Sequence, residues 1–277
     1  MIDGATRLIA HLGYPTHSFK APLIYNPWFE ARGINAVVMP MGCKAEDFAA
    51  FLPLVFRLSN IHGALITMPH KVAVLGLVDR VSATARIAGA ANAIRLGADG
   101  ALEADMFDGE GFVRGVIRKG QPVAGARVLV VGNGGVGSAI AASLAGAGAA
   151  EIALHDPNVG MMEALAGRLR AACPGLAVAT GSPDPAGFDI VVNASPLGMN
   201  DGDPLPMDVT RLSPATFVGE VVMKSAITPF LAAAQDRGCR IQVGTDMLFE
   251  QIPAYLEFFG LGTATAEELR EVAAIPK

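Results

Sequence analysis

A glycine-rich turn in the middle of the chain separates an apolar run from a stretch of small residues. Residues 127–137 read Arg-Val-Leu-Val-Val-Gly-Asn-Gly-Gly-Val-Gly, so Gly132, Gly134 and Gly137 fit the pattern G-x-G-x-x-G. In that pattern the first glycine permits a tight turn, the second lets a pyrophosphate approach the backbone, and the third allows close helix–strand packing. The alternative is an ordinary tightly packed βαβ unit, since the chain holds 32 glycines. The strand–turn–helix context favours a dinucleotide site.

The second strand of this unit indicates which dinucleotide is bound. Residues 151–155 read as a strand that ends at Asp156, about 20 positions after the turn, where a carboxylate can accept hydrogen bonds from a ribose hydroxyl. A carboxylate repels a 2′-phosphate, which needs an arginine, and the next arginine is Arg168. We therefore expect NAD rather than NADP. The residues of the turn expected to contact it are Gly132, Asn133, Gly134, Gly135, Val136 and Gly137.

Composition excludes several classes of protein. At 277 residues and 52% hydrophobic content, the chain can form two modest domains with buried cores. A net charge of −5 gives no basic field for nucleic acid, and no run of 18 apolar residues suggests a membrane span. Three isolated cysteines fit reduced thiols, and neither a metal-ligand spacing nor a secretory signal is apparent. We expect a cytoplasmic protein that binds small molecules, as a monomer or homodimer, with no metal.

The hydrophobic pattern predicts an α/β protein of two domains. In the first part, strands are expected at 6–12, 36–39, 64–67, 91–96 and 101–105, with helices at 22–32 and 44–58. A helix at 109–119 with Asp108 as N-cap then leads into a Rossmann-type doubly wound domain, with later strands at 177–180, 189–193, 217–222 and 240–243. The expected boundaries are 1–108 for a substrate-binding and catalytic domain and 109–244 for the dinucleotide domain. A helix at 247–259 within segment 245–277 is expected to pack back on the first domain.

Six short segments in this order resemble the shikimate dehydrogenase family over nearly the whole chain. The segments are 13–18 followed by Pro22, 63–71, 89–93, 105–112, 193–199 and 244–251. The resemblance implies a catalytic lysine at Lys71 and a catalytic aspartate at Asp108. It also implies that Ser18, Thr67, Asn92 and Gln251 contact substrate. Asn193, Ala194 and Ser195 end a strand at the carboxyl edge of the sheet, where open α/β sheets bind ligands, so we expect them, with Met247, to line the nicotinamide end of the cofactor site.

Lys71 and Asp108 are chemically suited to those roles. Oxidation of a secondary alcohol requires hydride transfer to nicotinamide and removal of the hydroxyl proton. A lysine can take that proton when burial lowers its pKa, and a neighbouring carboxylate can orient it. The alternative is that Lys71 is a solvated lysine at a helix start and that Asp108 only caps a helix. Asn92 could likewise be turn chemistry, and Gln251 a helix-surface residue.

The sequence departs from the family pattern in the expected substrate pocket. The family's first loop carries two serines one residue apart before a proline, whereas here the run is Ser18-Phe19-Lys20-Ala21-Pro22. Tyr25, Leu65 and Met223 stand where the family has histidine, asparagine and tyrosine. Each lost polar group removes a hydrogen bond worth about 1–3 kcal/mol in a buried site, so substrate preference should differ. Lys20 could pair with a substrate carboxylate, or it could be a solvated loop residue.

These patterns predict an NAD(P)-dependent alcohol dehydrogenase of shikimate dehydrogenase type. The expected substrate is shikimate, quinate or a related cyclic hydroxy acid. Two alternatives stay open: a non-catalytic sensor that binds NAD or a metabolite, and a dehydrogenase of an unrelated small hydroxy compound.

Overall fold

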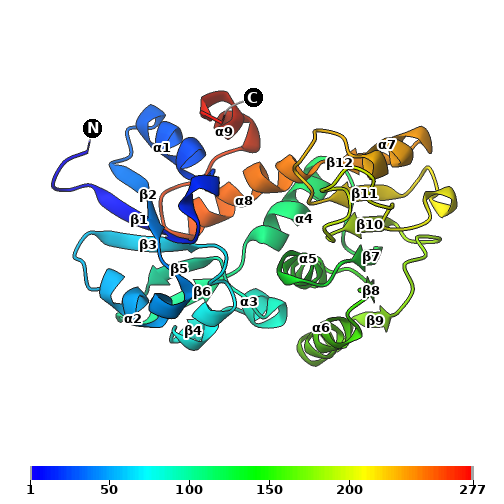
Figure 1. Ribbon diagram of the computed structural model, residues 1–277, viewed down its shortest axis with the longest axis horizontal. Helices are drawn as coiled ribbons and strands as arrows, with labels where there is room; N and C mark the ends of the chain where they lie inside the picture. Colours follow the sequence, from blue (N-terminus) through cyan, green and yellow to red (C-terminus); the bar gives the residue numbers. More distant parts are fainter. Residues whose placement is uncertain (1, 276–277) are drawn as a thin grey trace. The chain divides into compact units, whose positions relative to one another are not determined.

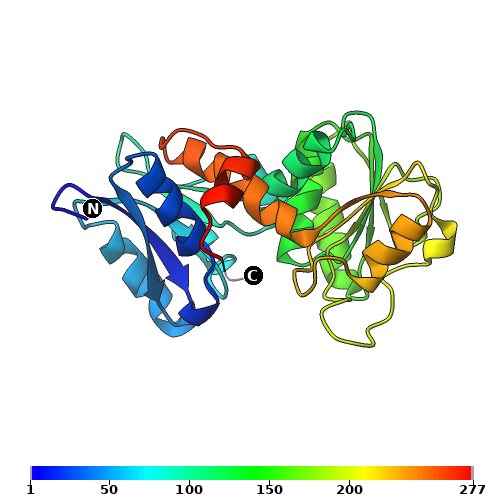
Figure 2. The same ribbon diagram turned by 90° about the horizontal axis from the view of Figure 1, so that it is seen from above.

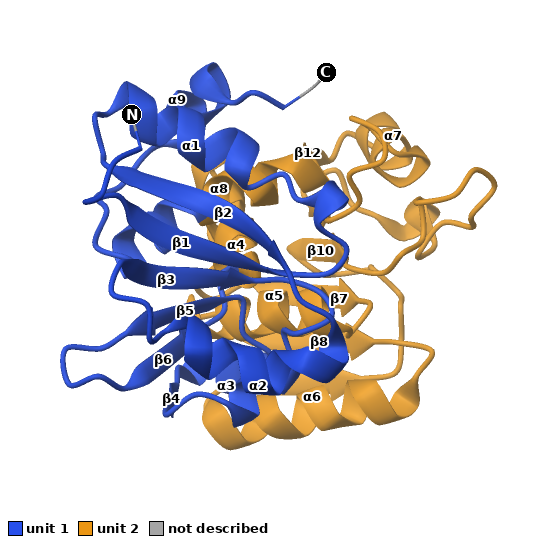
Figure 3. Cartoon of the chain, turned by 60° about the vertical axis from the view of Figure 1, so that its left-hand side comes forward, with its two compact units in different colours: residues 1–107, 252–277 blue, residues 108–251 orange. Residues whose placement is uncertain are grey.

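The computed structural model describes residues 2–275, and these divide into two compact units. Of the described residues, unit 1 comprises 2–107 and 252–275, and unit 2 comprises 108–251 (Figure 3). Helix α8 (Gly244–Phe258) contributes residues to both units, because its first half belongs to unit 2 and its second half to unit 1. The α/β class predicted from the sequence is confirmed.

Unit 1 is built on a mixed sheet of six strands in the order β2-β1-β3-β5-β6-β4 (Figure 1). The first three strands in that order are parallel, whereas β5 is antiparallel to both β3 and β6. The parallel part of the sheet meets its antiparallel part at the pairing of β3 with β5. Leu65 and Ala93, which are both buried, pair there. The strand bounds are β1 Arg7–Gly13, β2 Ala36–Gly42, β3 Ile61–Ile66, β4 Arg80–Val81, β5 Ala93–Leu96 and β6 Leu102–Asp105.

The helices of unit 1 bury one apolar face each. Helix α1 (Pro22–Ala31) packs along β2 and against α9 (Ala266–Val272), and its buried side chains Ile24, Tyr25, Trp28 and Phe29 follow helical spacing. A capping box between Thr265 and Glu268 starts α9. The other helices are α2 (Ala45–Val55) and α3 (Ala83–Ala88), together with short 3-10 turns at Thr16–Ser18 and Ala73–Gly76.

Unit 2 is a doubly wound Rossmann domain with six parallel strands. The strand order is β12-β11-β10-β7-β8-β9, which reads 3-2-1-4-5-6 when the strands are numbered from β7 and the sheet is followed from β9. The chain reverses direction across the sheet between β7 and β10, and open α/β sheets bind ligands outside the carboxyl ends of strands at such a point. The bounds are β7 Arg127–Val131, β8 Glu151–His155, β9 Ala177–Thr180, β10 Ile190–Asn193, β11 Phe217–Glu220 and β12 Arg240–Gln242.

Helices cover both faces of this sheet, as the view in Figure 2 shows for the orange α7 and the green helices. Leu129, Val131 and Val218 pack on one face with residues of α7 (Pro229–Asp236). On the opposite face, Phe112 of α4 (Asp108–Arg118) lies over Gly219, and α4 packs closely on α5 (Gly135–Gly146). The remaining elements are α6 (Val159–Ala172), capped by Asn158, and a 3-10 turn at Val209–Arg211.

Some elements differ from the sequence-based expectation. Asp108 is the first residue of α4 rather than the residue before it, and α8 starts three residues earlier than expected, at Gly244. The short strand β4 and helices α3, α6, α7 and α9 were not predicted. Strand β4 has only two residues, too few to give a period-2 pattern.

Candidate active site

The three glycines of the mid-chain turn meet different surroundings. Gly132 has φ +92°, a conformation that favours glycine, and its N–H donates to His155 O at 2.8 Å. A Cβ built on Gly137 would lie 1.9 Å from Gly132 O, so α5 packs directly against the turn. A Cβ on Gly134 or Gly135 would find nothing within 4 Å. The backbone at positions 134 and 135 is therefore open to a ligand, at the point where α5 begins and its first N–H groups are unsatisfied.

Asp156 follows β8 directly and is held against the glycine-rich turn. Its Oδ2 accepts from Asn133 N at 2.7 Å, and its Oδ1 accepts from Asn158 N at 2.8 Å. Each carboxylate oxygen has a further lone pair, so the same group can accept hydrogen bonds from ribose hydroxyls. Asn133 is buried, and its Oδ1 has no hydrogen-bond partner among the described residues.

The end of β10 contacts this turn. Ala194 N donates to Val131 O at 2.7 Å, and a Cβ on Gly132 would lie 2.5 Å from Ser195 N. Asn193 Oδ1 accepts from Ser195 Oγ at 2.6 Å and Ser195 N at 3.1 Å, which fixes the backbone after the strand. The structure thus brings Asn193, Ala194 and Ser195 beside the turn that the sequence assigned to the same cofactor.

Glu220 closes β11 next to Asn193 and is almost completely buried. Its carboxylate accepts from Asn193 Nδ2 at 3.5 Å, and a bond to Thr228 also favours the charged form. Burial is the larger effect and raises the pKa of Glu220. At the carboxyl edge of the sheet, Glu220 therefore takes up a proton more readily than an exposed glutamate would.

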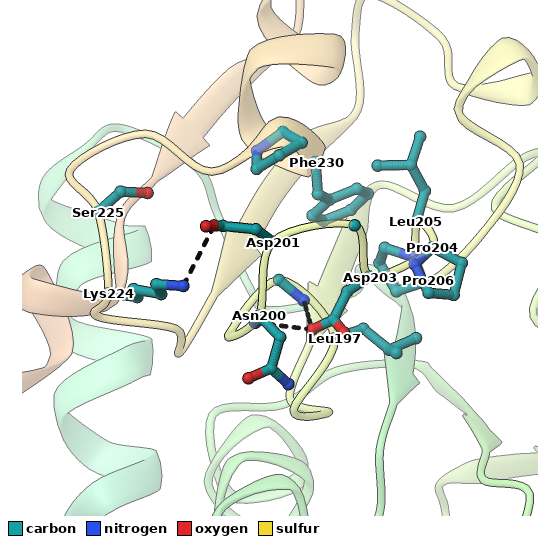
Figure 4. A pocket seen from close by; sticks show the side chains of 13 residues that line it. Leu197, Asn200, Asp201, Asp203, Pro204, Leu205, Pro206, Lys224, Ser225 and Phe230 are labelled. Atoms are coloured by element: carbon teal, nitrogen blue, oxygen red, sulfur yellow. Dashed lines mark hydrogen bonds and ion pairs between the residues drawn. The ribbon is translucent and has the colours of Figure 1, made fainter.

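The loop that follows Ser195 encloses a pocket of about 310 Å³ within unit 2 (Figure 4). Asp203 Oδ2 accepts from Gly198 N at 3.0 Å and Asn200 N at 2.9 Å, and these bonds hold the loop in a turn. Lys224 Nζ lies 3.2 Å from Asp201 Oδ1, and both residues line the pocket. None of the predicted site residues lines this pocket.

Helix α4 carries Asp108 and is packed between α5 and α8. A Cβ on Gly109 would lie 2.0 Å from Ala139 O of α5, and a Cβ on Gly111 would lie 2.6 Å from Met247 O of α8. Ion pairs Arg118–Glu250 and Lys119–Asp246, the latter at 3.1 Å, tie α4 to α8. The spacing of glycines after Asp108 thus lets three helices approach within unit 2. Asp108, Met247 and Gln251 are thereby placed on adjoining helices.

In unit 1, Thr67, Lys71 and Asn92 gather at the carboxyl end of β3. Thr67 N donates to Leu12 O at 2.9 Å, Ala91 N donates to Lys71 O at 2.8 Å, and Ile66 N donates to Asn92 O at 2.8 Å. Asn92 is 1% exposed, and its Oδ1 accepts from Phe107 N at 2.9 Å. The Asn92 side chain therefore fixes the backbone immediately before Asp108 in the sequence.

Lys71 follows a firmly anchored residue. The His70 ring is buried, stacks on Phe48 at 3.9 Å between centroids, and forms a 2.8 Å hydrogen bond between its Nε2 and Cys43 O. Lys71 itself is half-buried. The buried His70 ring therefore fixes the position of the backbone from which the Lys71 side chain extends.

Ser18 lies in the exposed turn at Thr16–Ser18, where its Oγ donates to Pro15 O at 3.2 Å. The next residue, Phe19, turns back over the sheet, and its ring stacks on His11 at 4.0 Å between centroids. Sequence reasoning missed His11, a buried histidine in β1. The only available signal was one polar residue within an otherwise apolar strand segment.

Two other kinds of feature, a metal site and a membrane span, are absent from the described residues. No group of three or more His, Cys, Asp and Glu side chains within residues 2–275 is arranged to hold a metal ion. No helix in that range has both the length and the apolar composition that crossing a membrane requires.

Known proteins resemble this chain along almost all of its length. Residues 12–94 match the model of the shikimate dehydrogenase substrate binding domain. The shikimate dehydrogenase (NADP(+)) of Acidiphilium cryptum is 34% identical over 277 residues, covering 99% of this chain and 98% of that protein. Quinate dehydrogenase from Corynebacterium glutamicum in complex with NAD is 29% identical with a TM-score of 0.86, covering 96% and 98% of the two chains. The 5-ketofructose reductase of Gluconobacter sp. strain CHM43 is 25% identical with a TM-score of 0.89, covering 98% and 99%.

Proposed function

The chain belongs to the shikimate dehydrogenase family and is an NAD(P)-dependent oxidoreductase of that type, and from this premise we propose that it uses NAD to interconvert a cyclic hydroxy acid and its ketone. Shikimate, quinate or a close analogue is the proposed substrate. The main support for the proposal is that Lys71, Thr67 and Asn92 lie together at the carboxyl end of β3. They belong to unit 1, whereas the glycine-rich turn belongs to unit 2.

Unit 2 supplies the groups that would hold the cofactor. The pyrophosphate would lie against the open backbone of Gly134 and Gly135, and Asp156 would accept from the ribose hydroxyls. Asn193, Ala194, Ser195 and Met247 would line the nicotinamide end. These residues fit a dinucleotide. The backbone of the turn is open at Gly134 and Gly135, where the pyrophosphate needs room, and it is closed at Gly137, where α5 packs against the turn. When bound, the cofactor accepts or supplies the hydride.

The residues of the chain itself handle the proton and the orientation of the substrate. Lys71 Nζ takes the hydroxyl proton during oxidation and returns it during reduction, and Asp108 orients the amine by a hydrogen bond. Thr67, Asn92 and Gln251 bind ring hydroxyls through neutral hydrogen bonds, and Ser18 contacts the substrate carboxylate from the exposed turn. Proton transfer of this kind contributes about 10²- to 10⁴-fold to rate.

The preference for NAD follows from the charge of Asp156. The neighbouring residues 155–158 contain no arginine to neutralise a 2′-phosphate, and both Asp156 oxygens face backbone N–H groups rather than a cation. We therefore expect kcat/KM with NAD to exceed that with NADP. Relatives named for NADP make this a discriminating measurement.

Steady-state kinetics of Lys71→Ala, with shikimate and quinate in both directions, test the catalytic assignment. We expect kcat to fall by about 10²-fold or more while the Kd of NAD stays within about twofold. Lys44→Ala is the matched control, because Lys44 is an exposed lysine of the same unit, at the start of α2. A Lys71→Ala enzyme with unchanged kcat would refute the acid–base role. A wild-type protein that binds NAD but turns over no substrate would instead favour a non-catalytic sensor.

A dehydrogenase of an uncharged hydroxy compound is the second candidate. Leu65, 4% exposed, and Phe19, stacked on His11, place apolar side chains on the substrate side of β1 and β3. The name of one similar enzyme, 5-ketofructose reductase, designates a substrate of that kind. Reduction of neutral keto sugars with NADH, with no turnover of hydroxy acids, would support this candidate over the first.

A further inference from the structure

His11 lies on the same face of the unit 1 sheet as Thr67. It pairs with Leu65 across β1 and β3, and paired residues of neighbouring strands point to the same face. Thr67 follows Leu65 by two positions, so it lies on that face about 6.6 Å further along the strand direction. Gly13 confirms the alignment, since a Cβ there would lie 2.3 Å from Thr67 Cγ2. The His11 side chain thus lies next to Thr67 on this face, one side-chain position closer to the start of the strands.

The His11 ring is enclosed but has unused polar atoms. Its side chain is 7% exposed, and Phe19 covers one ring face by stacking at an interplanar angle of 26°. Stacking leaves the ring edge, where both nitrogens lie, available for in-plane hydrogen bonds. Nδ1 is fully buried, and neither nitrogen has a hydrogen-bond partner among the described residues. Nε2 is therefore the nitrogen that a small ligand can reach.

Keeping a polar ring in such a place is costly. A buried polar atom without a partner destabilises the fold, whereas an apolar side chain of similar shape would not. The neighbouring histidines of unit 1 follow the usual pattern, because His62 Nε2 bonds to Phe259 O at 2.6 Å and His70 Nε2 to Cys43 O. Among residues 2–275, His11 differs from both in that its ring nitrogens have no hydrogen-bond partner.

The charge state of His11 fits a neutral ligand group. Burial, with a smaller contribution from the charge of Lys71, lowers the pKa of His11 to about 4. At neutral pH the ring is uncharged, with one nitrogen able to donate and the other able to accept. A hydroxyl group both donates and accepts, so it can pair with Nε2 in either tautomer. Lys71 is thus near enough for its charge to contribute to this lower pKa.

We propose that His11 is a specificity-determining residue that binds a hydroxyl of the substrate through Nε2, next to the hydroxyl that reacts at Lys71. This assignment rests on the proposed function, because it requires the substrate to bind at Lys71. It implies that the enzyme prefers polyhydroxylated substrates over analogues that lack the neighbouring hydroxyl. A site that pairs a buried polar group with a substrate hydroxyl rejects an analogue without it by a large factor.

The test compares His11→Phe with His11→Gln in the full-length protein. Phenylalanine keeps the aromatic stack on Phe19 and removes both nitrogens, while glutamine keeps a polar group at about the reach of Nε2. His62→Phe is the control for loss of a histidine from the same sheet. For each protein we would measure kcat and KM for the accepted substrate, the Kd of NAD and the Tm.

We expect His11→Phe to raise KM about tenfold or more, with kcat within about threefold and an unchanged Kd of NAD. His11→Gln should recover at least part of the KM, and His62→Phe should lower Tm with little change in KM. A purely structural His11 would instead change Tm alone, and a KM of folded His11→Phe within twofold of wild type overturns the inference. Should His11→Phe not fold, His11→Leu replaces it, with the same KM criterion. If wild-type protein turns over no hydroxy acid or keto compound, the proposed function itself fails, and the inference about His11 fails with it.

Discussion

Gly137 and Gly134 belong to one motif, yet the structure predicts opposite consequences when each is replaced by alanine. A methyl group on Gly137 would lie 1.9 Å from Gly132 O, whereas an ordinary contact needs about 3.4 Å. Helix α5 would have to move by roughly 1.5 Å relative to the turn, the difference between those two distances. The obstructing atom belongs to the backbone of a residue at φ +92°, so no side-chain rotation relieves the clash.

We therefore expect Gly137→Ala to lower the free energy of unfolding by about 3 kcal/mol or more, at the upper end of the range for overpacked sites. Gly134→Ala meets nothing within 4 Å, and its backbone has φ −66°. Because alanine is a poorer N-cap than glycine, its cost should be no more than about 1 kcal/mol. Its methyl group, however, would occupy the space proposed for the pyrophosphate, so the Kd of NAD should rise about tenfold or more.

Urea unfolding followed by far-ultraviolet circular dichroism measures the first effect, and calorimetric titration with NAD measures the second. Gly137→Ala with wild-type stability would refute the argument that this glycine exists for helix–turn packing. Gly134→Ala with wild-type affinity for NAD would refute the placement of the pyrophosphate. A loss of both properties in both variants would show that the two glycines do not have separate roles.

Three further predictions concern other parts of the chain. Gly109→Ala should destabilise the protein by about 1–3 kcal/mol, because its methyl group would lie 2.0 Å from Ala139 O. Gly167→Ala, in the exposed middle of α6, should stabilise the protein by about 0.5–1 kcal/mol. Equal changes of the free energy of unfolding in urea would contradict this contrast. Asp156→Asn should shift the ratio of kcat/KM for NAD over NADP at least about tenfold toward NADP, and an unchanged ratio would show that another group selects the cofactor. The unfolded chain binds a proton at His11 near pH 6.5 and the folded protein only near pH 4, so stability should fall as pH drops through that window, by up to about 3 kcal/mol. His11→Phe should remove that part of the loss in urea unfolding at pH 4 and pH 7, and a variant with the wild-type slope would exclude His11 as its source.

The dinucleotide-binding half of the protein could be predicted from the sequence because its signals are local. The turn at 132–137 and the carboxylate at Asp156 lie within one βαβ unit, and periodicity and spacing describe such a unit completely. The α/β class follows for the same reason, since each strand and helix has its own apolar pattern. The sequence therefore predicts the residues of this region that contact the cofactor.

Tertiary structure alone decided the features that depend on distant residues. The sheet order β2-β1-β3-β5-β6-β4 places His11 behind Thr67, and no pattern within β1 indicates this neighbour. Likewise the glycines after Asp108 are explained only by α5 and α8, which meet α4 from segments more than 25 residues away in the sequence. Local backbone conformation depends on short stretches of sequence. Contacts between distant residues, and the burial of their side chains, arise only when separate segments pack together. The glycine pattern was therefore legible in the sequence alone, whereas the position of His11 beside Thr67 was decided by folding.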